Sequence, residues 1–211
     1  MRILLVFFIL CCSTSLAQDQ VENRIIQTLG ALASQADSQQ NQGNYSESEE
    51  SRRQLISLME TTNFSPVEIA RQLSNLAAVL NLNGKPEEAQ ISCERAQSIL
   101  EINPTDDPIQ EAVLLGNLAE ALRLQGNLEG ARVRFEEELS LLSSLSIGDT
   151  HFAASAMVGI GAIEAELGNL QEARALYEVA LPIFLKISDK SHPTTARIVQ
   201  EYEAIQSRIE K

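Results

Sequence analysis

A set of residues that recurs every 42 positions constrains the fold of this chain most strongly. The triplet Asn75-Leu76-Ala77 returns as Asn117-Leu118-Ala119 and, in a degraded form, as Gly159-Ile160-Gly161. Three further sets keep the same register: Gly84, Gly126 and Gly168; Ala89, Ala131 and Ala173; and Cys93, Phe135 and Tyr177. A unit of this length buries its apolar face only by stacking on its neighbours, so the repeat predicts a solenoid.

Within each copy the apolar residues follow the spacing of a helix. Leu73, Leu76, Ala77 and Leu80 lie at i, i+3, i+4 and i+7. A glycine then ends the first helix, since glycine takes the left-handed C-cap conformation at little cost. Pro66 and Pro108 begin first helices, and second amphipathic runs begin near Pro86, Leu128 and Leu170. We therefore expect an all-α fold, a right-handed α-solenoid of antiparallel helix pairs with about four repeats plus a C-terminal capping helix.

These motifs resemble the tetratricopeptide repeat. Leu115-x-x-Leu118-Ala119-x-x-Leu122 is followed by Ala131-x-x-x-Phe135, as in that family, whereas the third copy departs from the pattern at Glu164. The 42-residue period, Asn117-Leu118-Ala119 and the linker Ser191-His192-Pro193 resemble the longer repeats of kinesin light chains. The resemblance covers residues 66–196 strongly and the preceding segment weakly. It implies a scaffold that binds proteins.

The N-terminus has the layout of a secretory signal peptide at residues 1–17. Arg2 precedes an apolar run from Ile3 to Cys12, and Ser15-Leu16-Ala17 supplies a small-x-small cleavage pattern. A membrane-spanning helix needs about 20 apolar residues, which exceeds this run. A lipoprotein signal at Cys11 or Cys12 is an alternative that lacks the usual small residue before the cysteine. We expect cleavage after Ala17 and a secreted or periplasmic protein that is not inserted in a membrane.

The remaining chain divides into three parts. Residues 18–65 are a degenerate first repeat or, alternatively, a flexible linker; residues 66–192 hold three repeats; and residues 193–211 form the capping helix. Pro182 falls inside a predicted helix, where we expect a kink or a frayed turn. Asn44 and Asn63 begin N-glycosylation patterns that matter only in a eukaryotic source.

The composition of the chain argues against several classes of partner and ligand. A net charge of −13 is poorly suited to nucleic acid, so we expect no nucleic-acid partner. We also expect no cofactor and no metal, because His151 and His192 lack further ligands at suitable spacing. The runs Glu49-Glu50 and Glu136-Glu137-Glu138 predict solvated helix faces. Cys93 shares its repeat position with aromatic residues, which predicts a packing role.

The resemblance implies a site on the concave face of the first helices. In such families the asparagine before the Leu-Ala pair commonly bonds the backbone of an extended peptide, which would assign that role to Asn75 and Asn117. Alternatively, these amides only satisfy neighbouring helices or water. The predicted partner-binding residues are Arg71, Asn75, Ala78, Val113, Asn117, Glu120 and Arg123. The expected partner is a protein or peptide; self-association as a homo-oligomer and an enzymatic function are the alternatives.

Overall fold

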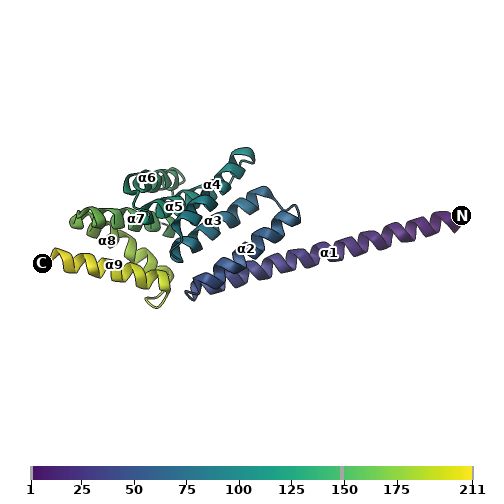
Figure 1. The fold of residues 1–211 in the computed structure, drawn as a ribbon, viewed down its shortest axis with the longest axis horizontal. Helices are drawn as coiled ribbons and strands as arrows, with labels where there is room; N and C mark the ends of the chain where they lie inside the picture. The colour runs from purple at the N-terminus through teal and green to yellow at the C-terminus, as the bar shows by residue number, and fades with distance from the viewer. Residues whose placement is uncertain (1, 148–149, 211) are drawn as a thin grey trace.

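The computed structural model describes residues 2–147 and 150–210, with side chains from Gln20 onward. Met1, Lys211 and the linker residues Gly148 and Asp149 lie outside the described residues. Within them the secondary structure is entirely helical (Figure 1). The helices are α1 (Arg2–Asn41), α2 (Tyr45–Thr61), α3 (Pro66–Leu82), α4 (Pro86–Ile102), α5 (Pro108–Leu124), α6 (Leu128–Ser144), α7 (His151–Leu167), α8 (Leu170–Ile187) and α9 (Pro193–Ile209).

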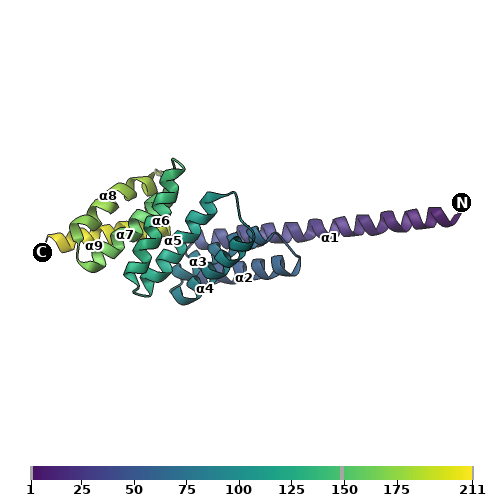
Figure 2. The same cartoon turned by 90° about the horizontal axis from the view of Figure 1, so that it is seen from above.

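The helices pair in chain order and the pairs stack side by side. Helix α3 packs on α4, α5 on α6 and α7 on α8, while α1 pairs with α2 and α9 packs on α8. The first helices α3, α5 and α7 also contact one another in sequence, and each second helix contacts the next first helix (Figure 2). This connectivity confirms the predicted all-α repeat solenoid.

The ends of the helices follow the sequence pattern. Helices α3, α4, α5 and α9 each begin with a proline, whose missing amide hydrogen is not needed in the first turn. The repeat glycines Gly84, Gly126 and Gly168 take φ values of 73°, 82° and 89°, so the left-handed conformation predicted for them is present. Pro182 does not end α8, which continues to Ile187.

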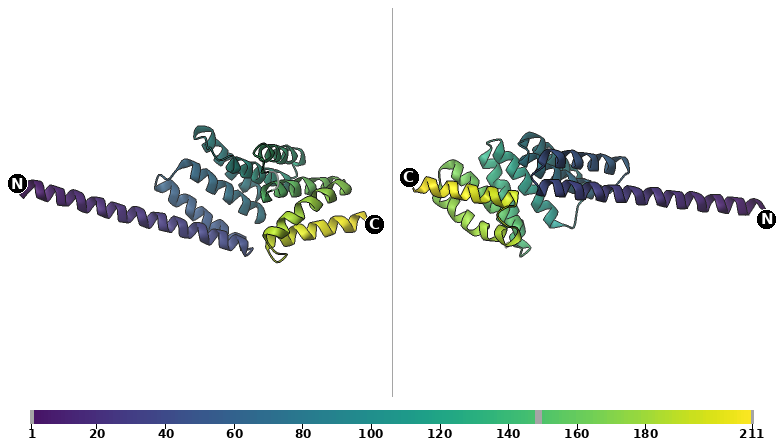
Figure 3. Two further views of the ribbon diagram at one scale, coloured as in Figure 1. Left: turned by 180° about the vertical axis from the view of Figure 1, so that it is seen from behind. Right: turned by 90° about the horizontal axis from the view of Figure 1, so that it is seen from below.

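The first pair extends the stack beyond the strong repeats. Leu29 of α1 and Leu55 and Met59 of α2 are buried in one apolar cluster with α3. Helix α1 is continuous through Ala17, and its N-terminal part projects away from the other helices (Figure 3). Cleavage after Ala17 stays a prediction. Within the described part of the chain, no helix has the length and apolarity needed to cross a membrane.

Small residues allow the two helices of each pair to approach. Ala77, Ala89, Ala119 and Ala131 are all fully buried. A Cβ on Gly161 would lie 2.8 Å from the ring of Tyr177, so the ring occupies the space that a larger residue would need. The equivalent Cys93 is 1% exposed, which confirms its packing role, and burial raises the pKa of its thiol to about 12.

Candidate functional site

The structure places the seven predicted residues on two neighbouring helices. Arg71, Asn75 and Ala78 belong to α3, and Val113, Asn117, Glu120 and Arg123 belong to α5. We call this set the α3–α5 face. Arg71 is exposed and the other six are half-buried. The contact between α3 and α5 places the two helices that carry these residues side by side.

Hydrogen bonds between side chains and backbone tie α3 to α5 and involve one of the two predicted asparagines. The Asn117 amide donates to the Ser74 carbonyl at 2.9 Å and to the Ser74 hydroxyl at 3.0 Å. Asn81 donates to the Asn117 carbonyl at 2.9 Å, so the two helices are joined in both directions. Gln110 adds a bond to the Val67 carbonyl. Asn117 thus holds two repeats together, whatever else it does.

The side chain of Asn75 makes fewer and weaker hydrogen bonds than that of Asn117. Its amide has a single side-chain contact within the described residues, 3.5 Å from Gln72 Oε1, at the limit of a hydrogen bond. Ala78 lies one turn further along α3. The two asparagines that the sequence treats as equivalent therefore differ: the amide of Asn117 bonds to α3, whereas that of Asn75 makes only a long bond within its own helix.

The charges of the face are matched within it. Arg123 Nε and Glu120 Oε2 are 2.9 Å apart, and Arg123 also pairs with Glu166 of α7. Burial alone would lower the pKa of the Arg123 guanidinium, but the two carboxylates outweigh burial and raise it. Arg71 lies 3.6 Å from Asp107. The polar and apolar groups that remain on the face are therefore an amide and small aliphatic side chains, and its charged side chains are already paired.

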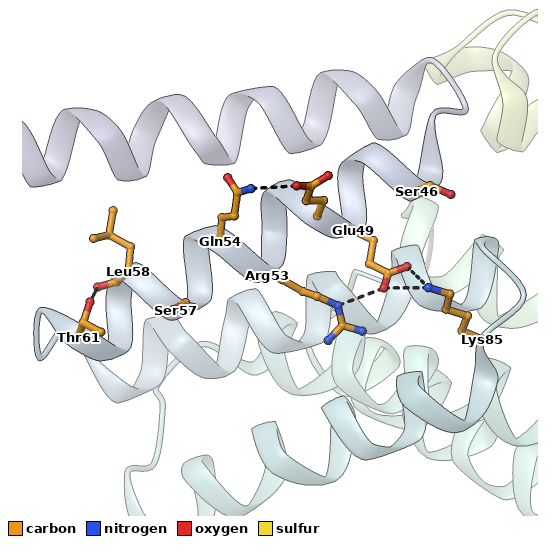
Figure 4. A pocket seen from close by; sticks show the side chains of 9 residues that line it. Ser46, Glu49, Arg53, Gln54, Ser57, Leu58, Thr61 and Lys85 are labelled. Atoms are coloured by element: carbon orange, nitrogen blue, oxygen red, sulfur yellow. Dashed lines mark hydrogen bonds and ion pairs between the residues drawn. The ribbon is translucent and has the colours of Figure 1, made fainter.

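An open pocket of about 690 Å³ lies away from this face, along α2 and beside Lys85 (Figure 4). Glu49 in its wall is only 7% exposed, so the prediction of a solvated face was wrong for this residue. Its carboxylate accepts hydrogen bonds from Lys85 at 2.9 Å, Asn83 at 2.8 Å and Arg53 at 3.1 Å. Burial would raise the pKa of Glu49, but these donors lower it overall. Lys85 and Arg53 in the pocket are therefore engaged in the contact between repeats. No repeat motif in the sequence predicts this contact.

Among the residues that the structure describes, no group of three or more His, Cys, Asp or Glu is arranged to hold a metal ion. His151 begins α7 and His192 is the N-cap residue of α9, so they belong to different helix starts. Burial lowers the pKa of His151.

Comparison with known proteins agrees with the repeat fold. A family model described as tetratricopeptide repeat matches residues 68–144 and 110–186, which together exceed half of the chain. The comparison with curated proteins finds no match. Three solved structures are similar in fold at less than 20% identity.

BtubC (BKLC) from P. vanneervenii has a TM-score of 0.60 and 19% identity, over 92% of this chain and 84% of that chain. The apo form of RapI has a TM-score of 0.56 and 15% identity, over 92% of this chain but 53% of that chain. A putative kinesin light chain of Podosopora anserina with nearly identical TPR-like repeats has a TM-score of 0.56 and 18% identity, over 87% of this chain and 97% of that chain.

Proposed function

The chain belongs to the tetratricopeptide repeat family, and we propose that it is an exported, non-enzymatic scaffold that binds an extended segment of a partner protein on the α3–α5 face. Repeats of this family generally serve as protein-interaction scaffolds. The N-terminal pattern of Arg2, an apolar run and Ser15-Leu16-Ala17 supports export. Sequencing the N-terminus of the protein from its source tests this part: export predicts a chain that begins at Gln18.

The observation that carries the binding proposal is the availability of the Asn75 amide. An amide both donates and accepts, so it can bond the N–H and C=O groups of an extended backbone without regard to the side chains. Ala78 of α3 and Val113 of α5 are the apolar members of the proposed face, and a backbone can lie against them. In this arrangement Asn117 is a positioning residue, because its bonds to Ser74 fix the spacing of the two helices.

A pair of double variants tests the location of the site. The full chain serves as bait in an extract of the source's envelope or secreted fraction. Ala78→Asp with Val113→Asp places two charges on the α3–α5 face, which should abolish capture of a partner. The matched control is Ile91→Asp with Val133→Asp, because these residues are 63% and 46% exposed on α4 and α6. Thermal melts of all three proteins verify folding.

Each outcome has a distinct meaning. The proposal is supported if capture is lost only with the α3–α5 variant and if the purified partner also binds the unmodified chain directly. Equal capture by both variants places the contact elsewhere and contradicts it. Loss with the α4 and α6 variant alone moves the site to the second helices.

One observation favours self-association as a second candidate. Val21 and Ile26 on α1 are 58% and 53% exposed, which leaves apolar surface on the helix that begins the stack. Sedimentation of the full chain beside Val21→Asp with Ile26→Asp tests this. A concentration-dependent dimer that the variant loses supports self-association, and a monomer at all concentrations excludes it.

A further inference from the structure

The contact between α5 and α7 lacks the polar link that joins α3 to α5. Ser74 and Asn117 make that earlier link, and the residues 42 positions on are Gly116 and Gly159. Two side chains of α6 fill the space instead. A Cβ on Gly116 would lie 2.5 Å from Oε2 of Glu138, and one on Gly159 would overlap the ring of Phe135. The side chains of Glu138 and Phe135 thus occupy the positions where the preceding junction has the hydrogen bond between Asn117 and Ser74.

Glu138 is the unusual member of this arrangement. It is 3% exposed, and its Oε2 is buried without a hydrogen-bond partner among the described residues. The equivalent residues of the neighbouring repeats, Ala96 and Ala180, are fully buried alanines. The prediction of a solvated Glu136-Glu137-Glu138 face was therefore wrong at its third residue. A carboxyl group stands where the other repeats have a methyl group, and Gly116 provides the room.

No cation is placed to neutralise this carboxyl group. The titratable and charged residues of the helices packed on α6 are Glu111, Glu120, Arg123, His151, Glu164 and Glu166, and those of α6 itself are Glu129, Arg132, Arg134, Glu136 and Glu137. Arg123 pairs with Glu120 and Glu166, Arg132 with Glu164, and Arg134 with Glu137, while Glu111, His151, Glu129 and Glu136 are exposed. Burial, with no neighbouring charge, raises the pKa of Glu138 to about 8.

Apolar side chains pack around this carboxyl group, and Leu139 contacts the clusters on both sides of it. Phe135 belongs to one buried cluster with Ala119 and Ile163, and Leu142 belongs to another with Ala112 and Ala153. Glu138 lies between Phe135 and Leu142 along α6. The ion pair that directly joins α5 to α7, between Arg123 and Glu166, involves a partly exposed Glu166 carboxylate. Both clusters join α5, α6 and α7, so the buried carboxyl group of Glu138, with its unpartnered Oε2, lies at the junction of these three helices.

We propose that the junction of α5, α6 and α7 opens when Glu138 ionises. The neutral carboxyl group fits the closed junction, whereas a carboxylate there would be buried without a partner and gains water when the helices separate. In the open state, Glu138 binds a proton with the ordinary affinity of an exposed carboxylate. Opening should thus become easier as pH rises from about 4.5 to about 8, roughly tenfold per pH unit, and should level off above that range.

Hydrogen exchange followed by mass spectrometry of the full chain tests this opening. Protection factors, corrected for the intrinsic pH dependence of exchange, are compared at about pH 5.5 and about pH 7.5. The amides of α6 and of the first half of α7 should lose protection by roughly fifty- to a hundredfold between these conditions. The amides of α2 to α4 in the same sample are the internal control and should change little.

Two variants separate the role of the proton from a general loosening. Glu138→Gln keeps the shape of the side chain and should abolish the pH-dependent loss of protection. Gly116→Ser with Glu138→Ala copies the pair Ser74 and Ala96 of the preceding repeat, so it provides a second pH-independent variant if the first folds poorly. Equal loss of protection in α2 to α4, pH-independent protection of the unmodified protein, or a pH effect that persists in the variants would each overturn the proposal.

Discussion

The ion pair between the half-buried Arg132 and the buried Glu164 allows a quantitative test of how the repeats pack. Glu164 occupies the position of Leu80 and Leu122 in the other repeats, and it is 1% exposed. Its carboxylate pairs with Arg132 of α6 and accepts a hydrogen bond of 2.7 Å from Asn169. A charged residue thus replaces the repeat leucine because the preceding second helix supplies its partner.

Arg132→Gln should destabilise the protein by about 3 kcal/mol. Removal of one member of a buried ion pair typically costs about 3–5 kcal/mol, because the remaining charge is left without a partner. The lower end applies here since Asn169 stays bonded to Glu164. Arg132→Gln with Glu164→Leu copies Gln90 and Leu122 of the preceding junction, so it should recover the wild-type stability or exceed it by about 1–4 kcal/mol.

Urea unfolding at neutral pH, followed by circular dichroism, measures both effects. The slope of each transition must be compared as well, because a repeat array can unfold in parts. A cost below about 1 kcal/mol for Arg132→Gln would contradict the reasoning, since an exposed pair contributes no more than that. A double variant less stable than the single one would also contradict it.

Three further predictions concern individual contacts. Ala131→Leu should cost about 1–3 kcal/mol in urea unfolding, because the fully buried Cβ leaves no space for a larger side chain; an unchanged midpoint would mean that α5 and α6 pair differently. Asn117→Ala should cost about 1–2 kcal/mol by loss of its bonds to Ser74, and Asn75→Ala less than about 0.5 kcal/mol; equal costs would refute the distinction between the two amides. The folded protein binds the Glu138 proton more tightly than the unfolded chain, so the free energy of unfolding should fall by up to about 1.4 kcal/mol per pH unit from about pH 5 to about pH 8. Unfolding curves of Glu138→Gln should lack this slope, and a slope that persists would assign it to other groups.

The repeat register made much of the fold predictable. Gly126 and Ala131 recur at fixed distances because every repeat places them in the same environment, at a turn and at a close helix contact. The helix starts at Pro66 and Pro108 follow from the local chemistry of proline in the same way. Such features depend on neighbouring residues or on the period, and both can be read from one sequence.

The candidate site was only partly predictable. The sequence grouped Asn75 with Asn117, but which amide turns toward the next helix depends on how α3 and α5 lie against each other. Glu138 was assigned to solvent because it adjoins Glu136 and Glu137. Its alignment with Ala96 and Ala180, and the glycine at 116, are signals in the repeat register that identify it as buried.

The network around Glu49 carried no comparable signal. Glu49 bonds Lys85 and Asn83 across the junction between the first two helix pairs, and these residues belong to no shared motif. Their proximity arises only when the weak first repeat stacks on the second. Contacts between unlike side chains of adjacent repeats can therefore be identified only from the structure.

Site-specific photo-crosslinking tests the central claim, that a partner segment lies on the α3–α5 face, most directly. A photoreactive amino acid is placed at position 78 or 113 of the full chain, and at the exposed positions 91 or 133 as controls. The account predicts a crosslinked partner peptide from 78 and 113, identified by mass spectrometry, and none from 91 and 133. Crosslinks that form only from the controls would contradict it and place binding on the second helices.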